Sequence, residues 1–269
     1  MTGKKVLYVS SEVIPYLPNN DISTLTYKLP KVVNKNGGQT RIFIPKYGLI
    51  NERRHQLHEV IRLSGMNLII DDLDMPLIIK VASIPKERMQ VYFIDNDEYF
   101  KNRLLDSDKK KKLYEDNDER AIFFAKGVVE TIKKLNWTPD IIHVHGWIAS
   151  LMPLYLKQYY KDEPLFSKSK IVTSIYENEI IGDLNSNIIN KIKFDEVESE
   201  TLNVLENPTY ENLYKLSIMN SDGVVFASEN IKKSYLDVAT NSKIPLLKCG
   251  FKDGFEKEYM DFYNDKILN

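Results

Sequence analysis

The fold is decided by residues 4–20, which read KKVLYVSSEVIPYLPNN. The apolar and β-branched residues before Ser10 predict a strand, and apolar residues at helical spacing from near Ile22 predict an amphipathic helix. A strand, a polar turn and a helix in this order are typical of the opening of a doubly wound α/β sheet. Because ligands bind beyond the carboxyl ends of the strands in such sheets, we expect the first ligand-binding loop between Ser10 and Asp21.

Strand and helix patterns alternate along the rest of the chain. Further strands are predicted over 40–45, 62–70, 75–84, 91–94, 141–144, 170–175 and 223–227, and helices over 118–135, 151–160 and 213–219. This alternation predicts an α/β fold with a doubly wound, mostly parallel sheet of the Rossmann-like type. Pro30 is expected to bend or interrupt the first helix, because its ring removes a backbone donor. Ser228 or Asn230 is expected to cap a last clear helix that ends near Val238.

The chain is predicted to form one domain over residues 1–240 and a C-terminal tail over residues 241–269. The tail holds four aromatic residues that fall on one side of an expected helix, namely Phe255, Tyr259, Phe262 and Tyr263. Aromatic side chains on one helical face are typical of a surface that packs on a core. We therefore expect the tail to pack on the domain.

Charge and cysteine content limit the function classes. The 269 residues include 37 Lys and Arg against 38 Asp and Glu, a net charge of -1, which argues against nucleic acid or a membrane surface as the main partner. With Cys249 as the only cysteine, an intrachain disulfide is impossible, and this fits a reducing compartment. The sequence shows neither a signal-peptide pattern nor a run of about eighteen apolar residues, so we expect a cytoplasmic protein.

Seven spaced motifs follow one another along the chain. They are VLYVSSEVIP at 6–15, Leu29-Pro30, IPKYG at 44–48, VYFID at 91–95 with Tyr99-Phe100, Asp116-Asn117 with Glu119-Arg120 and Phe123-Phe124, PDIIHVH at 139–145 with Trp147, and Ser221-Asp222 before Val224-Val225. In this order they resemble the bacterial glycogen synthases and plant starch synthases. The resemblance implies the GT-B fold of a retaining glycosyltransferase, with this chain as the acceptor-side N-terminal domain and without the domain that binds the nucleotide sugar.

The first departure from the family pattern lies in the loop after the first strand. The family has a Lys-Thr-Gly-Gly-Leu loop there, whose lysine and glycines approach the donor phosphates. This chain instead reads Pro18, Asn19, Asn20, Asp21 and Ile22. The cation and both glycines are gone, and a negative charge is added, so the resemblance implies that the phosphate contacts are lost.

Three further positions, at two sites, depart from the family. In the run His-Ala-His-Asp-Trp-His, Gly146 replaces the aspartate and Ile148 the last histidine, and Tyr176 replaces a histidine expected near the transferred sugar. Because several electrostatic contacts are lost together, we expect a catalytically inactive binding or regulatory module. Two alternatives remain: a glucosyltransferase subunit that uses ADP- or UDP-glucose with a partner chain, and an α-glucan-binding module.

The candidates for a ligand cleft are the polar and aromatic residues at the strand ends, namely Glu12, Tyr16, His145, Trp147, Tyr176 and Glu177. Glu12 is interpreted either as an acid or base or as an acceptor for loop amides. The three aromatic residues are interpreted either as a stacking surface for a sugar or as core. His143 and His145 point the same way, but without an identifiable third ligand we predict no metal site, and no cofactor. The expected partners are an α-glucan, a nucleotide sugar or a protein.

Overall fold

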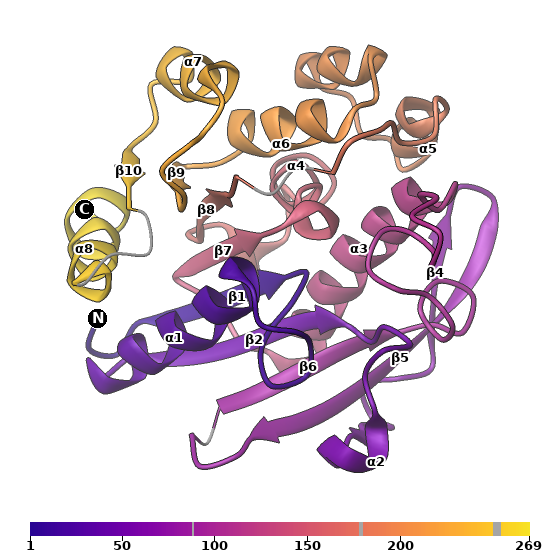
Figure 1. The fold of residues 1–269 in the computed structure, drawn as a ribbon, viewed down its shortest axis with the longest axis horizontal. Coiled ribbons are helices and arrows are strands. Elements are labelled where there is room, and N and C mark those ends of the chain that lie inside the picture. The colour runs from indigo at the N-terminus through magenta and orange to yellow at the C-terminus, as the bar shows by residue number, and fades with distance from the viewer. Residues whose placement is uncertain (88, 178–179, 250–253) are drawn as a thin grey trace.

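The computed structural model describes residues 1–87, 89–177, 180–249 and 254–269. In this part of the chain, ten strands form a mixed sheet in the order β10-β9-β8-β7-β1-β2-β6-β5-β3, and β4 pairs with β5 (Figure 1). The parallel strands are β1 (Lys5–Ser10), β2 (Gln39–Pro45), β6 (Met89–Asp95), β7 (Ile141–His145), β8 (Lys170–Ile175), β9 (Gly223–Phe226) and β10 (Leu246–Lys248). The antiparallel strands are β3 (His58–Glu59), β4 (Met66–Ile70) and β5 (Leu73–Ile84). The predicted α/β fold with a mostly parallel sheet is confirmed.

Helices connect the parallel strands. The described helices are α1 (Asp21–Lys35), α2 (Glu52–His55), α3 (Asn117–Leu135), α4 (Met152–Lys157), α5 (Ile188–Phe194), α6 (Tyr210–Met219), α7 (Lys233–Asn241) and α8 (Phe255–Asp261). Short helical turns lie at Trp147–Ala149, Pro164–Phe166, Glu200–Glu206 and Phe262–Ile267.

Three local predictions differ from the structure. The helix α1 continues through Pro30 without interruption, because Leu29 and Val33 are fully buried and this packing outweighs one missing hydrogen bond. The helix α7 begins after Lys232, so neither Ser228 nor Asn230 caps it. The strand predicted over 62–70 begins only at Met66, since the residues before it form a turn.

The strand β1 marks the switch point of the sheet. It pairs in parallel with β2 on one side and with β7 on the other, with Tyr8 opposite both Ile42 and His143. The strand order therefore runs away from β1 on both sides, through β2 and β6 on one side and through β7, β8 and β9 on the other. The loops at the carboxyl ends of β1 and β7 separate at this point, which is where doubly wound folds bind ligands.

The C-terminal segment contributes to the same sheet and core. Within it, β10 pairs with β9, and the side chains of Tyr259 and Tyr263 are fully buried. The amino group of Met1 donates to Asn264 Oδ1 at 3.1 Å, so the helical turn that follows α8 lies beside the N-terminal end of the chain (Figure 1). Among the residues described, no helix combines the length and the apolar character needed to cross a bilayer.

Candidate functional site

The loop between β1 and α1 is held by a capping box. Asn20 Oδ1 accepts from the Ser23 amide at 2.8 Å, and the Asn20 amide donates to Ser23 Oγ at 2.9 Å. The other end of the same side chain, Asn20 Nδ2, donates to Glu12 Oε2 at 2.7 Å. Asn20 therefore fixes both the start of α1 and the carboxylate of Glu12.

A cavity of about 170 Å³ opens at the switch point, beyond the ends of β1 and β7. Its lining residues come from five parts of the chain and are Ser11, Glu12, Asn20, Ile22, Leu105, Asp106, Trp147, Ile180 and Tyr214. Two carboxyl groups, those of Glu12 and Asp106, are among them. The indole of Trp147 is 4% exposed, and its Nε1 has no hydrogen-bond partner among the residues that the structure describes. The cavity lining thus includes two carboxyl groups and a tryptophan whose buried N–H has no partner in the described part of the chain.

Glu12 is buried in this cavity, with 6% of the residue exposed. Burial raises the pKa of its carboxyl to about 7; the charge of Asp106 adds to the rise, and the hydrogen bond from Asn20 opposes it. The Glu12 charge in turn adds to the raised pKa of the buried Tyr47 phenol. Near neutral pH the Glu12 carboxyl can therefore either accept or donate a hydrogen bond.

The raised pKa of Glu12 predicts a pH-dependent stability. Because the folded state holds this proton to about pH 7 while the unfolded chain releases it near 4.5, stability falls as pH rises through this window. The Glu12→Gln variant should gain up to about 3 kcal/mol on wild type between about pH 5 and about pH 8. Urea unfolding at both pH values measures this difference. If wild type and variant keep the same difference at both, the prediction is wrong.

Two buried histidines, His143 and His145, lie at alternate positions of β7. His143 Nε2 and Ser174 Oγ are 2.8 Å apart, and His143 Nδ1 contacts the hydroxyl of Tyr263 from the tail. His145 Nδ1 lies 2.7 Å from the hydroxyl of Tyr176. Burial lowers the pKa of His145 to about 3 and that of His143 well below its usual value. Both rings are therefore neutral, and the tyrosines hold their orientation.

The other residues predicted for the cleft lie in different surroundings. The ring of Tyr16 packs on Phe93 and His55, with centroid distances of 5.0 and 4.9 Å, and is not part of the cavity lining. Glu177 is exposed and accepts from Asn230 Nδ2 at 3.3 Å. Of the six predicted cleft residues, Glu12 and Trp147 line the cavity, whereas the side chains of Tyr16, His145 and Tyr176 are buried in the core.

The positions that depart from the family pattern are built into the local structure. Ile148 is fully buried, and Gly146 adopts φ 79° and ψ 169°, a backbone conformation essentially restricted to glycine. A Cβ atom on Gly146 would lie 1.8 Å from Ser11 Oγ. The backbone at this end of β7 therefore has no room for a side chain.

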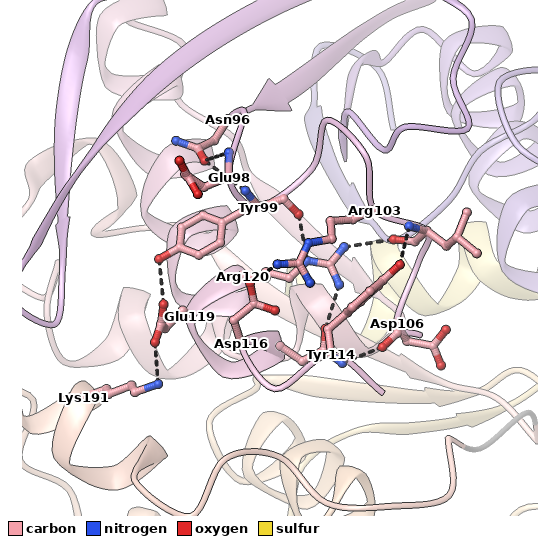
Figure 2. A network of polar contacts seen from close by, with 12 residues as sticks. Asn96, Glu98, Tyr99, Arg103, Asp106, Tyr114, Asp116, Glu119, Arg120 and Lys191 are labelled. Carbon is pink, nitrogen blue, oxygen red and sulfur yellow. Dashed lines mark hydrogen bonds and ion pairs between the residues drawn. The ribbon is translucent and has the colours of Figure 1, made fainter. Parts of the chain in front are cut away.

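Sequence reasoning missed the polar network beside the cavity. Figure 2 shows that Arg120, at the start of α3, points into the loop that carries Asp106, while Glu119 on the same turn bonds to Tyr99 and Lys191. One signal was present: Arg120 shares a helical face with the apolar Phe123 and Phe124, and a charge on such a face needs buried partners. The loop around Asp106 carries no comparable pattern.

The sheet, its switch point and the cavity define a Rossmann-like α/β domain with a cavity at the carboxyl edge of the strands, where folds of this class bind ligands. Residues 5–242 match the family described as "Starch synthase catalytic domain". The chain belongs to this family, as the sequence motifs predicted.

Known relatives agree with this assignment. The glycogen synthase of Chlorobium luteolum (strain DSM 273 / BCRC 81028 / 2530) is 35% identical over 253 residues, covering 92% of this chain and 49% of the relative. That of Chlorobium limicola (strain DSM 245 / NBRC 103803 / 6330) is 38% identical over 196 residues, covering 72% and 40%. The solved catalytic domain of starch synthase IV from Arabidopsis thaliana, bound to ADP and acarbose, matches with a TM-score of 0.75 at 16% identity, over 98% of this chain and 54% of that one. The chain spans about half the length of the curated relatives it matches.

Proposed function

We propose that this domain binds the end of an α-glucan in the cavity between Glu12 and Trp147 and does not itself transfer glucose. The observation that carries the proposal is the buried indole donor of Trp147, which lines the same cavity as two carboxyl groups. A sugar hydroxyl both accepts and donates hydrogen bonds, so it satisfies the indole and a carboxylate together. A cation would leave the indole unpaired.

The charge of the cavity favours a neutral ligand over a phosphate. Asp106, and Glu12 when it is ionised, would repel an anion, and the amide of Ser23 at the start of α1 already donates to Asn20. With about 170 Å³, the cavity is smaller than a typical ligand pocket of about 300–1,000 Å³. It therefore suits a single sugar unit at the end of a chain rather than a nucleotide sugar.

The proposed lack of transfer rests on the altered positions. The loop at 18–21 contains no lysine, and Asn20 is committed to the cap and to Glu12. The neutral His145 is bonded to Tyr176, at the position where the family has a histidine. Each lost electrostatic contact of this kind costs about 3 kcal/mol of barrier, so the combined loss in rate would be large.

Ligand binding can be measured by the fluorescence of Trp147. The chain has two tryptophans, so Trp137→Phe leaves Trp147 as the only indole reporter. We expect a saturable signal with maltotriose at millimolar concentration. In calorimetry, Trp147→Phe should weaken maltotriose binding about tenfold through the loss of one hydrogen bond, while Trp137→Phe serves as the matched control. Absence of any maltotriose signal would contradict the binding proposal.

Catalysis is tested separately with labelled ADP-glucose and UDP-glucose and glycogen as acceptor. We expect no incorporation above a control without protein, with the Chlorobium luteolum glycogen synthase as positive control. Incorporation by the purified chain would overturn the proposed inactivity. Incorporation only after a second chain co-purifies would instead establish the alternative, a glucosyltransferase subunit.

A further inference from the structure

The wall of the cavity that carries Leu105 and Asp106 belongs to a long connection, residues 96–116, between β6 and α3. Its tip is closed on itself by the bridge between Ser107 and Leu113, by turns around Asp108 and by the amide of Tyr114, which donates to Asp106 O at 3.1 Å. These bonds shape the tip but do not join it to the rest of the domain, so the segment needs contacts from elsewhere to keep one position. The first turn of α3 supplies them.

Arg120 is the central contact. It is fully buried, and its guanidinium donates to Tyr99 O at 3.0 Å, to Leu104 O at 3.0 Å and to Asn117 Oδ1 at 2.6 Å (Figure 2). These three bonds go to uncharged oxygens, two of them on the backbone of the connection. The guanidinium also lies 5.1 Å from the ring centre of Tyr114. Arg120 thus binds the connection at both flanks of its tip.

Asn117 extends this contact to the cavity itself. Its Nδ2 donates to the carbonyl oxygen of Asp106 at 2.8 Å and to the hydroxyl of Tyr210 at 2.6 Å. Because Arg120 bonds to the amide oxygen of Asn117, it fixes which way this amide points. The ring of Trp147 also lies beside Arg120, with its centre 5.7 Å from the guanidinium carbon. Arg120 therefore bonds to Asn117, which holds the backbone of Asp106, and also lies beside the ring of Trp147.

We propose that Arg120 is a positioning residue that holds the 96–116 connection as a wall of the cavity and, through Asn117, keeps Asp106 close to Glu12. Burial of a charged group without a carboxylate among these three bonds costs free energy. We attribute the presence of Arg120 at this position to the order that its bonds give to the 96–116 connection. The expected effect of Arg120 on sugar affinity rests on the function proposed above, whereas its expected effect on the position of the 96–116 connection does not.

The lysine run Lys109–Lys112 provides a built-in reporter for the wall. These residues are exposed at the tip of the connection, so trypsin cleaves there when the tip detaches. We expect Arg120→Met to raise the cleavage rate in this run by about tenfold or more at an unchanged fraction of folded protein.

Arg103→Met is the matched control. Arg103 lies in the same connection and pairs with Asp116, but it is partly exposed and does not bond to Asn117 or Leu104 in the described contacts. It should change cleavage about threefold at most.

A second readout is the Glu12 carboxyl, followed by NMR titration. When the wall detaches, water reaches Glu12 and Asp106 moves away, so the pKa of Glu12 should fall from about 7 toward 4.5 in Arg120→Met. Arg120→Lys keeps a donor and should give intermediate values in both readouts. If Arg120→Met does not fold, Asn117→Ala leaves Arg120 in place, removes the bond to Asp106 together with those to Tyr210 and Arg120, and should shift the pKa of Glu12 in the same direction.

Neither readout requires a ligand, so the test stands even if maltotriose does not bind. If maltotriose binds to wild type, its affinity should fall about tenfold in Arg120→Met and stay unchanged in Arg103→Met. Folded Arg120→Met or Asn117→Ala protein with wild-type cleavage and an unchanged Glu12 pKa would overturn the proposal.

Discussion

The Gly146→Asp variant, which restores the residue that the family has at this position, is expected to lose about 2–5 kcal/mol of stability. Two effects add. The backbone conformation of Gly146, with φ 79° and ψ 169°, costs any other residue about 1–3 kcal/mol. A Cβ atom would also lie 1.8 Å from Ser11 Oγ and 2.9 Å from Ser11 Cβ, so the loop after β1 must move. Urea unfolding measures the free energy.

The two effects can be separated by a matched control. Gly65 has φ 78°, but nothing lies within 4 Å of the position that an added Cβ would take. Gly65→Ala should therefore lose only the backbone contribution, about 1–2 kcal/mol of stability. Gly146→Ala should cost clearly more than Gly65→Ala, and the added change Ser11→Gly should recover the difference. Equal costs for both alanine variants would show that the contact with Ser11 is harmless. The expected result means that the departure at Gly146 is a change of backbone as well as of side chain.

The Lys126→Met variant should be destabilised by about 3–5 kcal/mol, because it leaves a buried carboxylate without its cation. Lys126 Nζ lies 2.5 Å from Asp195 Oδ1 and donates to Ile69 O at 2.7 Å, while Tyr155 donates to the other oxygen of Asp195 at 2.7 Å. Both charged side chains are almost fully buried, at 5% and 6% exposure. A loss of this size is a large part of the total stability of a domain.

Two further variants check this interpretation. The double change Lys126→Met and Asp195→Asn removes both charges and keeps a group that can bond to Tyr155, so it should recover about half of the loss. Lys112→Met removes an ion pair to Glu115 whose side chains are 74% and 85% exposed, and it should change stability by less than about 0.5 kcal/mol. Chemical unfolding of all three proteins at one pH provides the comparison. Equal losses for Lys126→Met and Lys112→Met would contradict a special role of burial.

The sequence predicted those features that repeat locally. The apolar run of β1, the alternation of strands and helices and the family motifs all place Glu12 and Trp147 at neighbouring strand ends, where the structure has its cavity. Parallel strands buried on both sides are recognisable because nearly every residue in them is apolar. The strand β10 was missed since three residues, Leu246–Lys248, are too few to show a period.

The part of the site that the sequence did not predict depends on contacts between distant segments. In the structure the backbone of Asp106 is bonded to Asn117 and to the amide of Tyr114, and Arg120 bonds to the neighbouring Leu104. No local sequence pattern indicates which loop a buried arginine will bond to. The double role of Asn20 was also missed. Its short polar side chain suggested a lost glycine loop, whereas in the structure it caps α1 and bonds to Glu12. Capping residues are chosen for local hydrogen bonding, and such positions resemble degenerate loops in sequence.

The contact between the tail and the central strands bears on the order in which the molecule can fold. The hydroxyl of Tyr263 lies 3.4 Å from that of Tyr8 in β1 and bonds to His143 in β7, although these residues are 255 and 120 positions apart in the chain. Contacts of such high sequence separation slow folding, because the ends of a long loop must meet before the contact gains anything. During synthesis from the N-terminus, the contact between His143 and Tyr263 can therefore form only after residue 263 has been made. The central strands β1 and β7 are therefore synthesised before the tail, but their side-chain contacts are complete only when the tail has packed on them.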